Sequence, residues 1–437
     1  MSAEDTADAV DQLTDRRPGT RRPLLGAAVG TFIEFYDFAV YALTVPIVAA
    51  SFFPPGDAAV ALISAFAVYG VAFIVRPLGG VVFGAIGDRF GRRRVLMLVL
   101  TLIGVATALI GVLPTYEQVG LLAPLLLVAL RVAQGLSAGG EVTSATSFAL
   151  EHAPGHRRST WITTVVAMSA VSSIVGLIVV LGLGAALPEA AFAAWGWRIP
   201  FLLALPLSLV GLYIRLRTDE SPAFERAQRR KALSATPVRE ALARNGRAVF
   251  AAFALAAMSA LAFYYLVGYF PTYLQVNAGL SRSDALLSNG VALVGFTACL
   301  IVAGSIGDRV GRLPMIRIGA CLLVVTSPPA FLLAGSGSVA AAVAGQLLLA
   351  LALCVFGGGS YAALLEVFPT RTRLSGAALG YNAGYALFGG TAPLLGSVLV
   401  TWTGSQYAPG YYLATVALLV LLCTFRLPET KETDIHA

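Results

Sequence analysis

Charge is scarce in this sequence. Charged residues make up 12% of the 437 residues and hydrophobic residues 57%, with a mean hydropathy of +0.80. Soluble domains average about 25% charged and about 45–50% apolar residues, so this chain cannot cover the surface of a soluble globule. The composition excludes a soluble enzyme, a nucleic-acid-binding protein and a disordered scaffold. It indicates a protein that is solvated by the lipid bilayer.

Cysteine, histidine and lysine are also rare. The four cysteines lie in apolar runs without CxxC spacing, and the three histidines lie in polar stretches. The sequence therefore supports neither a disulfide framework nor a zinc site, and we expect no metal and no cofactor. Two lysines among 30 basic residues, with abundant Ala and Gly, are typical of a GC-rich prokaryotic genome. This bias predicts a plasma-membrane location.

Long apolar segments dominate what is present. A membrane-crossing helix needs about 20 mostly apolar residues, and the sequence has twelve such segments. The first six lie near residues 24–52, 59–86, 95–114, 119–148, 160–187 and 199–214. The second six lie near residues 248–276, 284–306, 314–334, 339–364, 374–402 and 408–427. The predicted fold class is an all-α membrane protein with twelve transmembrane helices.

The basic residues predict the orientation of these spans. With the N-terminus inside, 26 of the 30 lie in cytoplasmic segments, and only Arg198 and Arg282 lie outside. Positive charge gathers on the cytoplasmic side of membrane proteins, so both termini should be cytoplasmic. The predicted organisation is a tail (1–23), a six-helix half (24–214), a central loop (215–247), a second six-helix half (248–427) and a short tail (428–437).

Two motifs recur in the same order in the two halves. The pattern GxIGDRxGR occupies Gly84–Arg92 and again Gly304–Arg312. The pattern ExxPxxxR occupies Glu151–Arg158 and again Glu366–Arg373. Two unrelated motifs at nearly equal offsets indicate a duplication, and six spans per copy make the repeats parallel. Parallel six-span repeats are the pattern of major facilitator transporters.

The repeated loops have the chemistry of a gate. Asp88 can lie at the N-terminal end of a neighbouring helix, where the helix dipole favours a negative charge, while the arginines reach acidic groups of the other half. The glycines permit a tight turn and close helix approach. The alternative is that these residues only determine topology. The predicted gate residues are Gly87, Asp88, Arg89, Gly91, Arg92, Asp308, Arg309, Glu151, Arg158, Glu366 and Arg373.

Four charges lie where lipid should be. Glu34 and Asp37 share one face of the first span, Arg76 lies in the second and Arg131 in the fourth. Each charge at the bilayer centre costs about 2.5–3.5 kcal/mol on insertion scales, so they must face one another or a water-filled cavity. A carboxylate beside a movable arginine can carry a proton. A permanent buried ion-pair network is the structural alternative, and Glu141 is left open between the two interpretations.

The second half contributes neutral groups to the predicted cavity. Tyr264 and Tyr265 lie well inside the seventh span, and Asn382 lies in the eleventh. Tyrosines in membrane spans often serve only as interface anchors. With Arg76, Tyr36 and Gln134, these residues are the predicted substrate contacts, whereas Glu34, Asp37 and Arg131 are the predicted proton-coupling residues.

These motifs resemble the metabolite:H⁺ symporter branch of the major facilitator superfamily. The similar stretches in the first half are Ile33–Phe38, Arg76–Gly79, Gly87–Arg94, Arg131–Glu141 and Glu151–Pro154. Those further on are Trp195–Pro200, Glu220–Phe224, Pro271–Leu274, Glu366–Arg371 and Gly389–Pro393. The resemblance implies proton-coupled uptake of a zwitterion or organic acid, with the proton handled by Glu34, Asp37 and Arg131. The stretch Val142–Thr146 departs from the family pattern.

The predicted function is secondary active transport by alternating access, as proton symport, energised by the proton gradient. A proline- or betaine-like substrate is favoured over a dicarboxylate, because Arg131 is expected to pair with the first-span acids and leave Arg76 free for one carboxylate. The alternatives are proton-driven efflux on the same fold and, from another class, a membrane-embedded enzyme. The expected partners are a small substrate, protons and the lipid bilayer, and not nucleic acid, and the chain is expected to be a monomer.

Overall fold

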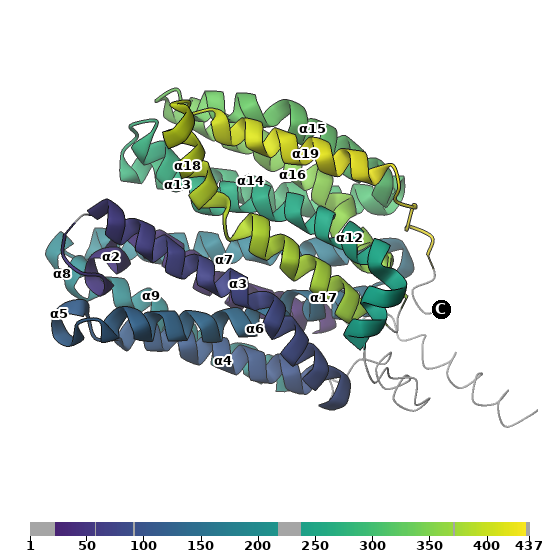
Figure 1. Cartoon of the computed structure of the whole chain (residues 1–437), viewed down its shortest axis with the longest axis horizontal. Helices are drawn as coiled ribbons and strands as arrows, with labels where there is room; N and C mark the ends of the chain where they lie inside the picture. Colours follow the sequence, from purple (N-terminus) through teal and green to yellow (C-terminus); the bar gives the residue numbers. More distant parts are fainter. Residues whose placement is uncertain (1–21, 57, 91, 217–236, 370–371, 434–437) are drawn as a thin grey trace, which may run out of the picture.

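The computed structural model describes residues 22–433 except 57, 91, 217–236 and 370–371 (Figure 1). In this part of the chain all regular structure is helical, which confirms the predicted fold class. Ten of the described helices are long and apolar enough to cross a membrane, and two shorter apolar helices, Met97–Val112 and Ala408–Thr424, complete the twelve spans.

Six spans form the first half. They are α2 (Arg22–Phe52), α3 (Ala58–Phe90), α4 (Arg92–Val112), α6 (Leu122–His152), α7 (Arg158–Ala186) and α10 (Ala204–Leu216). Short helical turns connect them: α5 (Tyr116–Val119), η1 (Gly155–Arg157), α8 (Glu189–Ala194), η2 (Gly196–Arg198) and α9 (Ile199–Leu202). The sixth span runs through α9 and α10.

Two spans of the second half are composite. The seventh runs through α12 (Pro237–Tyr264), the π-helical turn η3 (Tyr265–Tyr269) and α13 (Phe270–Val276). The eleventh runs through α17 (Arg373–Gly384), the π-helical turn η4 (Tyr385–Gly389) and α18 (Ala392–Thr403). Such π turns inside α-helices frequently mark functional sites. The remaining spans are α14 (Arg282–Val310), α15 (Arg312–Ala334), α16 (Val339–Glu366) and α19 (Ala408–Thr424).

The central segment is partly helical. Residues 237–247, which the sequence analysis assigned to the loop, begin α12, and the helix departs from helical geometry at Asn245 (φ −122°, ψ 27°). The rest of the predicted loop, 217–236, and the N-terminal tail up to residue 21 lie outside the described residues.

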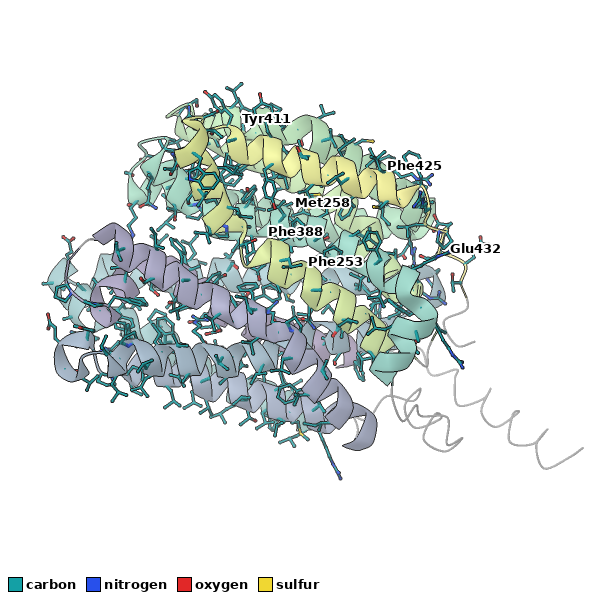
Figure 2. All side chains as sticks on the ribbon, in the orientation of Figure 1. Phe253, Met258, Phe388, Tyr411, Phe425 and Glu432 are labelled. Atoms are coloured by element: carbon teal, nitrogen blue, oxygen red, sulfur yellow. The ribbon has the colours of Figure 1, made fainter. Side chains whose placement is uncertain are left out.

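The two halves lie side by side. Figure 1 shows α2–α10 in purple to blue below and α12–α19 in green to yellow above. Across the boundary α7 packs along α14, while α3 and α6 pack along α17. Large apolar side chains cover the outside, among them Tyr411 on α19 and Phe425 directly after it, which are 61% and 64% exposed (Figure 2). An apolar exterior of this kind suits lipid rather than water.

Glycines allow backbone contact between α3 and α6. A Cβ at Gly79, Gly135 or Gly139 would collide with main-chain atoms of the facing helix, at Leu136, Ala72 and Arg76 respectively. Small residues let membrane helices approach closely and gain van der Waals contact. Because Arg76 and Arg131 are on these two helices, this packing fixes their separation.

Candidate functional site

Two ion pairs lie at the centre of the first half. Arg76 Nη2 of α3 lies 2.7 Å from Glu34 Oε1 of α2. Arg131 Nη1 of α6 lies 3.2 Å from Asp37 Oδ2, one turn further along α2. All four side chains are at most 1% exposed. The sequence analysis expected these charges to face one another or a water-filled cavity, and in the structure they face one another as two pairs.

Asp37 is the more fully bonded of the two acids. It accepts hydrogen bonds from Arg131, from the Thr107 hydroxyl (2.9 Å) and from Gln134 Nε2, which also donates to Thr107 Oγ1. Thr107, on α4, was not singled out from the sequence, because a lone threonine in an apolar helix carries no signal. Three side chains from two helices therefore bond the Asp37 carboxylate.

Glu34 is held less completely. Its Oε1 accepts from Arg76, and its Oε2 has no hydrogen-bond partner among the described residues. Arg76 Nε and Nη1 likewise lack partners in this part of the chain. Glu141, buried on α6, is within electrostatic range of Glu34. This pair thus keeps unused hydrogen-bonding capacity in a buried environment, where unpaired polar atoms are costly.

Aromatic rings enclose both guanidinium groups. The Arg76 guanidinium carbon lies 4.7 Å from the Phe38 ring centroid and 4.9 Å from that of Phe73. The Arg131 guanidinium carbon lies 3.7 Å from the Tyr41 ring centroid. A cation over an aromatic face is stabilised by about 0.5–2 kcal/mol. The rings therefore offset part of the cost of burying the charges.

The opposite half supplies an aromatic wall without charge. Tyr264, at the end of α12, packs edge-on against Phe73 (5.0 Å between centroids) and against Tyr385 of η4 (6.1 Å). Tyr385 stacks on Tyr381 (4.0 Å) and lies 6.0 Å from the Arg76 guanidinium carbon. The Tyr264 hydroxyl has no hydrogen-bond partner among the described residues. The Glu34–Arg76 pair therefore faces tyrosines of α12, α17 and η4 across the boundary of the halves.

Three predicted substrate contacts either lie away from the Glu34–Arg76 pair or already make hydrogen bonds within the protein. Tyr265 points into the second half, where it packs against Tyr269 and Phe331. The Tyr36 hydroxyl donates to the Pro200 carbonyl and so attaches α2 to α9. Asn382 Nδ2 donates to the Gly139 carbonyl (2.8 Å) and joins α17 to α6. Sequence position alone does not show which way a tyrosine faces, and here adjacent tyrosines face opposite directions.

The second copy of the repeated loop joins the two halves. Asp308, near the end of α14, accepts hydrogen bonds from the backbone N–H groups of Ser159 (2.8 Å) and Thr160 (2.9 Å) and from the Thr160 hydroxyl. These residues form the N-terminus of α7, so the carboxylate lies at the positive end of that helix dipole. Arg312 bonds both Asp308 (3.2 Å) and, through two nitrogens, Glu366.

The chain following α19 also attaches here. Glu429 accepts hydrogen bonds from the backbone N–H groups of Arg312 (2.9 Å) and Leu313 (3.0 Å) at the start of α15. The Thr430 hydroxyl donates to Glu366 (2.7 Å), and Lys431 Nζ donates to the Arg309 carbonyl. Sequence analysis missed this segment because it was read as a tail.

Four other predicted gate residues make fewer contacts that bear on a gate. Arg158 donates to the Thr433 carbonyl (2.8 Å), Arg309 has an exposed side chain and Arg373 is buried with a long bond to the Phe368 carbonyl. Glu151 is half-buried at the end of α6. Of the first copy, the side chains of Gly87, Asp88, Arg89 and Arg92 are not described, and Gly91 lies outside the described residues. A role of these residues in a gate therefore stays a prediction.

Comparison with known proteins gives consistent similarities. A sequence profile of the Major Facilitator Superfamily matches residues 27–381. The chain is 34% identical to the glycine betaine/proline/ectoine/pipecolic acid transporter OusA of Dickeya dadantii, over 98% of this chain and 87% of that protein. It is 33% identical to the proline/betaine transporter of Escherichia coli, over 95% of this chain and 85% of that protein.

The fold is that of a solved transporter. The proton:xylose symporter XylE bound to 6-bromo-6-deoxy-D-glucose superposes with a TM-score of 0.79 at 20% identity, over 95% of this chain and 97% of that chain. An inward-open structure of XylE from E. coli superposes with a TM-score of 0.70, over 94% of this chain and 97% of that chain. At this level of identity the likeness establishes the architecture alone.

Proposed function

The chain belongs to the Major Facilitator Superfamily, and we propose that it is a proton-coupled symporter for the uptake of a small zwitterion of the proline or betaine type. Membership confirms the predicted resemblance and the prediction of a transporter rather than an enzyme. Drug efflux is not favoured, because the relatives are named for proline, betaine, ectoine and pipecolic acid.

One observation carries the proposal: the buried Glu34–Arg76 pair faces an aromatic wall of the other half. A symporter needs a group that takes up a proton, a group that binds substrate and a reason for the two events to depend on each other. This pair supplies all three if the substrate's carboxylate and Glu34 compete for Arg76.

Glu34 is the better candidate for the proton. Three side chains stabilise the Asp37 anion, whereas a single guanidinium stabilises that of Glu34. Hydrogen bonds to a carboxylate favour its charged form, and burial favours the neutral form. Protonation of Glu34 therefore costs less than protonation of Asp37. The Asp37–Arg131 pair then acts as a fixed neutral unit, the structural alternative that the sequence left open.

Protonation of Glu34 releases Arg76. In the charged state the guanidinium is neutralised by Glu34, so the original expectation of a free Arg76 does not hold in this conformation. Once Glu34 is neutral, Arg76 has an uncompensated charge and can accept a substrate carboxylate. Each event makes the other more favourable by the same factor, as linkage requires. This coupling suits a monocarboxylate better than a tricarboxylate, since only one arginine is released.

The aromatic wall suits the other end of the ligand. Phe73 and Tyr385 lie beside the Arg76 guanidinium and Tyr264 packs against both rings. A cationic amine, including a quaternary one, is attracted to aromatic faces. The substrate then lies with its carboxylate on α3 and its amine against α12 and η4. Alternating access follows if substrate bridging draws the halves together here while the contacts around Asp308 open.

Uptake measurements test the proposal. In proteoliposomes with an imposed inward pH gradient, radiolabelled proline or betaine should accumulate, and an uncoupler should abolish the accumulation. Excess unlabelled proline or betaine should compete and citrate should not. Competition by citrate or α-ketoglutarate without competition by the zwitterions would replace the substrate class. Accumulation insensitive to the uncoupler would remove the proton from the mechanism. We further propose a monomer in the plasma membrane, divided at the central segment as predicted.

A further inference from the structure

A cavity lies between the halves, away from the Glu34–Arg76 and Asp37–Arg131 pairs. It has a volume of about 230 Å³ and is bounded by α2, α7, η3, α13 and the start of α14. This is the end of the molecule opposite to Glu432 (Figure 2). Pockets for drug-sized ligands measure about 300–1,000 Å³, so an occupant of this cavity is smaller than that.

Arg282 contributes a positive charge to this cavity. It is the first residue of α14, has an exposed side chain and has no hydrogen-bond or ion-pair partner among the described residues. Among the described residues, none that lines the cavity is acidic or aromatic. A guanidinium without a counter-charge attracts carboxylates and binds them through paired N–H groups.

Asn289 contributes a fixed acceptor. Its side chain is 4% exposed, and its Nδ2 donates to the Leu266 carbonyl (2.6 Å) and to Gln346 Oε1 (2.9 Å). Gln346 in turn donates to Ser288 (2.6 Å), which fixes the orientation of the amide. Asn289 Oδ1 has no partner in the described part of the chain, although the residue lines the cavity. It is therefore available to accept a hydrogen bond from a ligand.

The spacing of the two groups defines the ligand. Seven residues separate Arg282 from Asn289 on α14, which is about 10 Å along the helix axis. A hydrogen bond of about 2.9 Å at each end leaves room for a ligand a few ångströms long. Its carboxylate would face Arg282 and its N–H would face Asn289, and the apolar side chains of Leu43, Leu177 and Leu286 would contact its body.

From this geometry we propose that the cavity is an outer capture site for small zwitterions that retain an N–H, such as primary and secondary amino acids. A quaternary ammonium cannot donate to Asn289 and finds no aromatic face or acid here, so betaine should bind poorly. The central site, by contrast, offers aromatic rings. The capture site rests on the proposed function for its role in uptake, since it delivers substrate to the Glu34–Arg76 pair. Its occupancy, however, is measurable without transport.

Cysteine protection measures occupancy. Thr272→Cys places a thiol on the cavity wall, and Val276→Cys, one turn further on and 74% exposed, is the matched control outside it. A membrane-impermeant maleimide should label both from the outer side. L-Proline should protect position 272 and not position 276, and betaine should protect neither. Failure of the reagent to reach position 272, or equal protection by betaine, would overturn the proposal.

Arg282→Gln and Arg282→Lys test the charge. Arg282→Gln should raise the KM for proline uptake roughly five- to tenfold, leave Vmax within about twofold and abolish protection at position 272, whereas Arg282→Lys should retain most of both. The KM for betaine should not change. An unchanged KM and unchanged protection in Arg282→Gln would overturn the capture site and leave the proposed function standing. If proline protects position 272 but the protein transports no zwitterion, the capture site stands and the proposed function is overturned.

Discussion

The carboxylate of Asp308 accepts a hydrogen bond from the backbone N–H of Ser159, 2.8 Å away, across the boundary between the two halves. With Thr160 the same carboxylate accepts three hydrogen bonds at the start of α7. The sequence analysis proposed this position, at the N-terminus of a neighbouring helix, for Asp88 in the first copy of the loop. In the described residues it is the second copy that adopts it.

Asp308→Asn should therefore shift the protein towards the conformation that is open at this end. The variant loses a charge at the helix terminus, where a cap contributes about 1 kcal/mol, so the equilibrium should change by roughly fivefold. Distances between spin labels on the adjoining ends of α7 and α14 measure the shift. Asp284→Asn, in the first turn of α14 at the opposite end, is the matched control. An unchanged distance distribution in Asp308→Asn would show that the contact does not hold the gate.

Glu34→Gln should uncouple transport. The amide cannot release a proton, so accumulation driven by a pH gradient should be lost, whereas exchange of labelled for unlabelled substrate should persist because it needs no net proton movement. Counterflow and gradient-driven uptake in the same proteoliposomes measure the two. Glu117→Gln, on the exposed turn α5, serves as the control. Retained gradient-driven accumulation in Glu34→Gln would move the proton to another group.

The Asp37–Arg131 pair should reveal itself through stability. Asp37→Asn leaves a buried guanidinium without its counter-charge, which typically costs about 3–5 kcal/mol. The double variant Asp37→Asn/Arg131→Gln removes both charges and should recover much of that loss, although it need not transport. Thermal unfolding in detergent of the two single variants and the double variant gives the coupling. Additive losses would mean that the two residues do not act as a pair.

The Glu429 contact should persist over the physiological pH range. Burial raises the pKa of this carboxyl, but hydrogen bonds from the backbone N–H groups of Arg312, Leu313, Lys431 and Thr430 outweigh it and leave the pKa below its usual value. The contact is thus complete above the unfolded pKa of about 4.3 and is lost only as pH falls through the lower folded value. Hydrogen exchange at 430–431, corrected for intrinsic rates, should show equal protection at pH 6 and pH 8. Glu429→Gln should lower the protection at both, and a steep loss of wild-type protection between pH 8 and pH 6 would contradict the assignment.

The proposed orientation predicts opposite labelling at the two ends. An impermeant thiol reagent applied to intact cells should modify Ser283→Cys and should not modify Glu432→Cys until the cells are opened. Glu432 lies at the same end of the molecule as Phe425 (Figure 2). The reverse pattern would invert the topology.

The sequence predicted the architecture because a helix that crosses a bilayer needs a long apolar segment. Such a segment can be recognised from the sequence without knowing what the helix packs against. It also identified the four buried charges, since a charge in a membrane span is costly wherever it points. It expected Arg131 to pair with the first-span acids and Arg76 to stay free, whereas in the structure Arg76 pairs with Glu34. Glu34 and Asp37 lie three residues apart on one face of α2, so sequence position does not decide which acid meets which arginine. The packing of α3 against α6 assigns Arg76 to Glu34 and Arg131 to Asp37.

The sequence also did not show which way the tyrosine side chains of the second half point. Tyr264 and Tyr265 are adjacent, yet Tyr264 contacts Phe73 of the other half and Tyr265 contacts Phe331 of its own. The π-helical turn that begins at Tyr265 changes the helical register at this point, and no residue pattern announces it. The contacts of 428–433 were missed for a related reason, since a short polar segment gains its meaning only from the backbone groups that it meets.

In the described residues, the Glu34–Arg76 and Asp37–Arg131 pairs belong to the first half, and the wall of the second half that faces Arg76 is neutral and aromatic. Under the proposed mechanism, proton coupling and solute choice are therefore encoded by separate segments of the gene. Substitutions in α12, η3, α17 or η4 can alter which solute is preferred without disturbing the ion pairs. After a gene duplication, substitutions in the second half would therefore change the transported solute, while the first half would keep the coupling to protons.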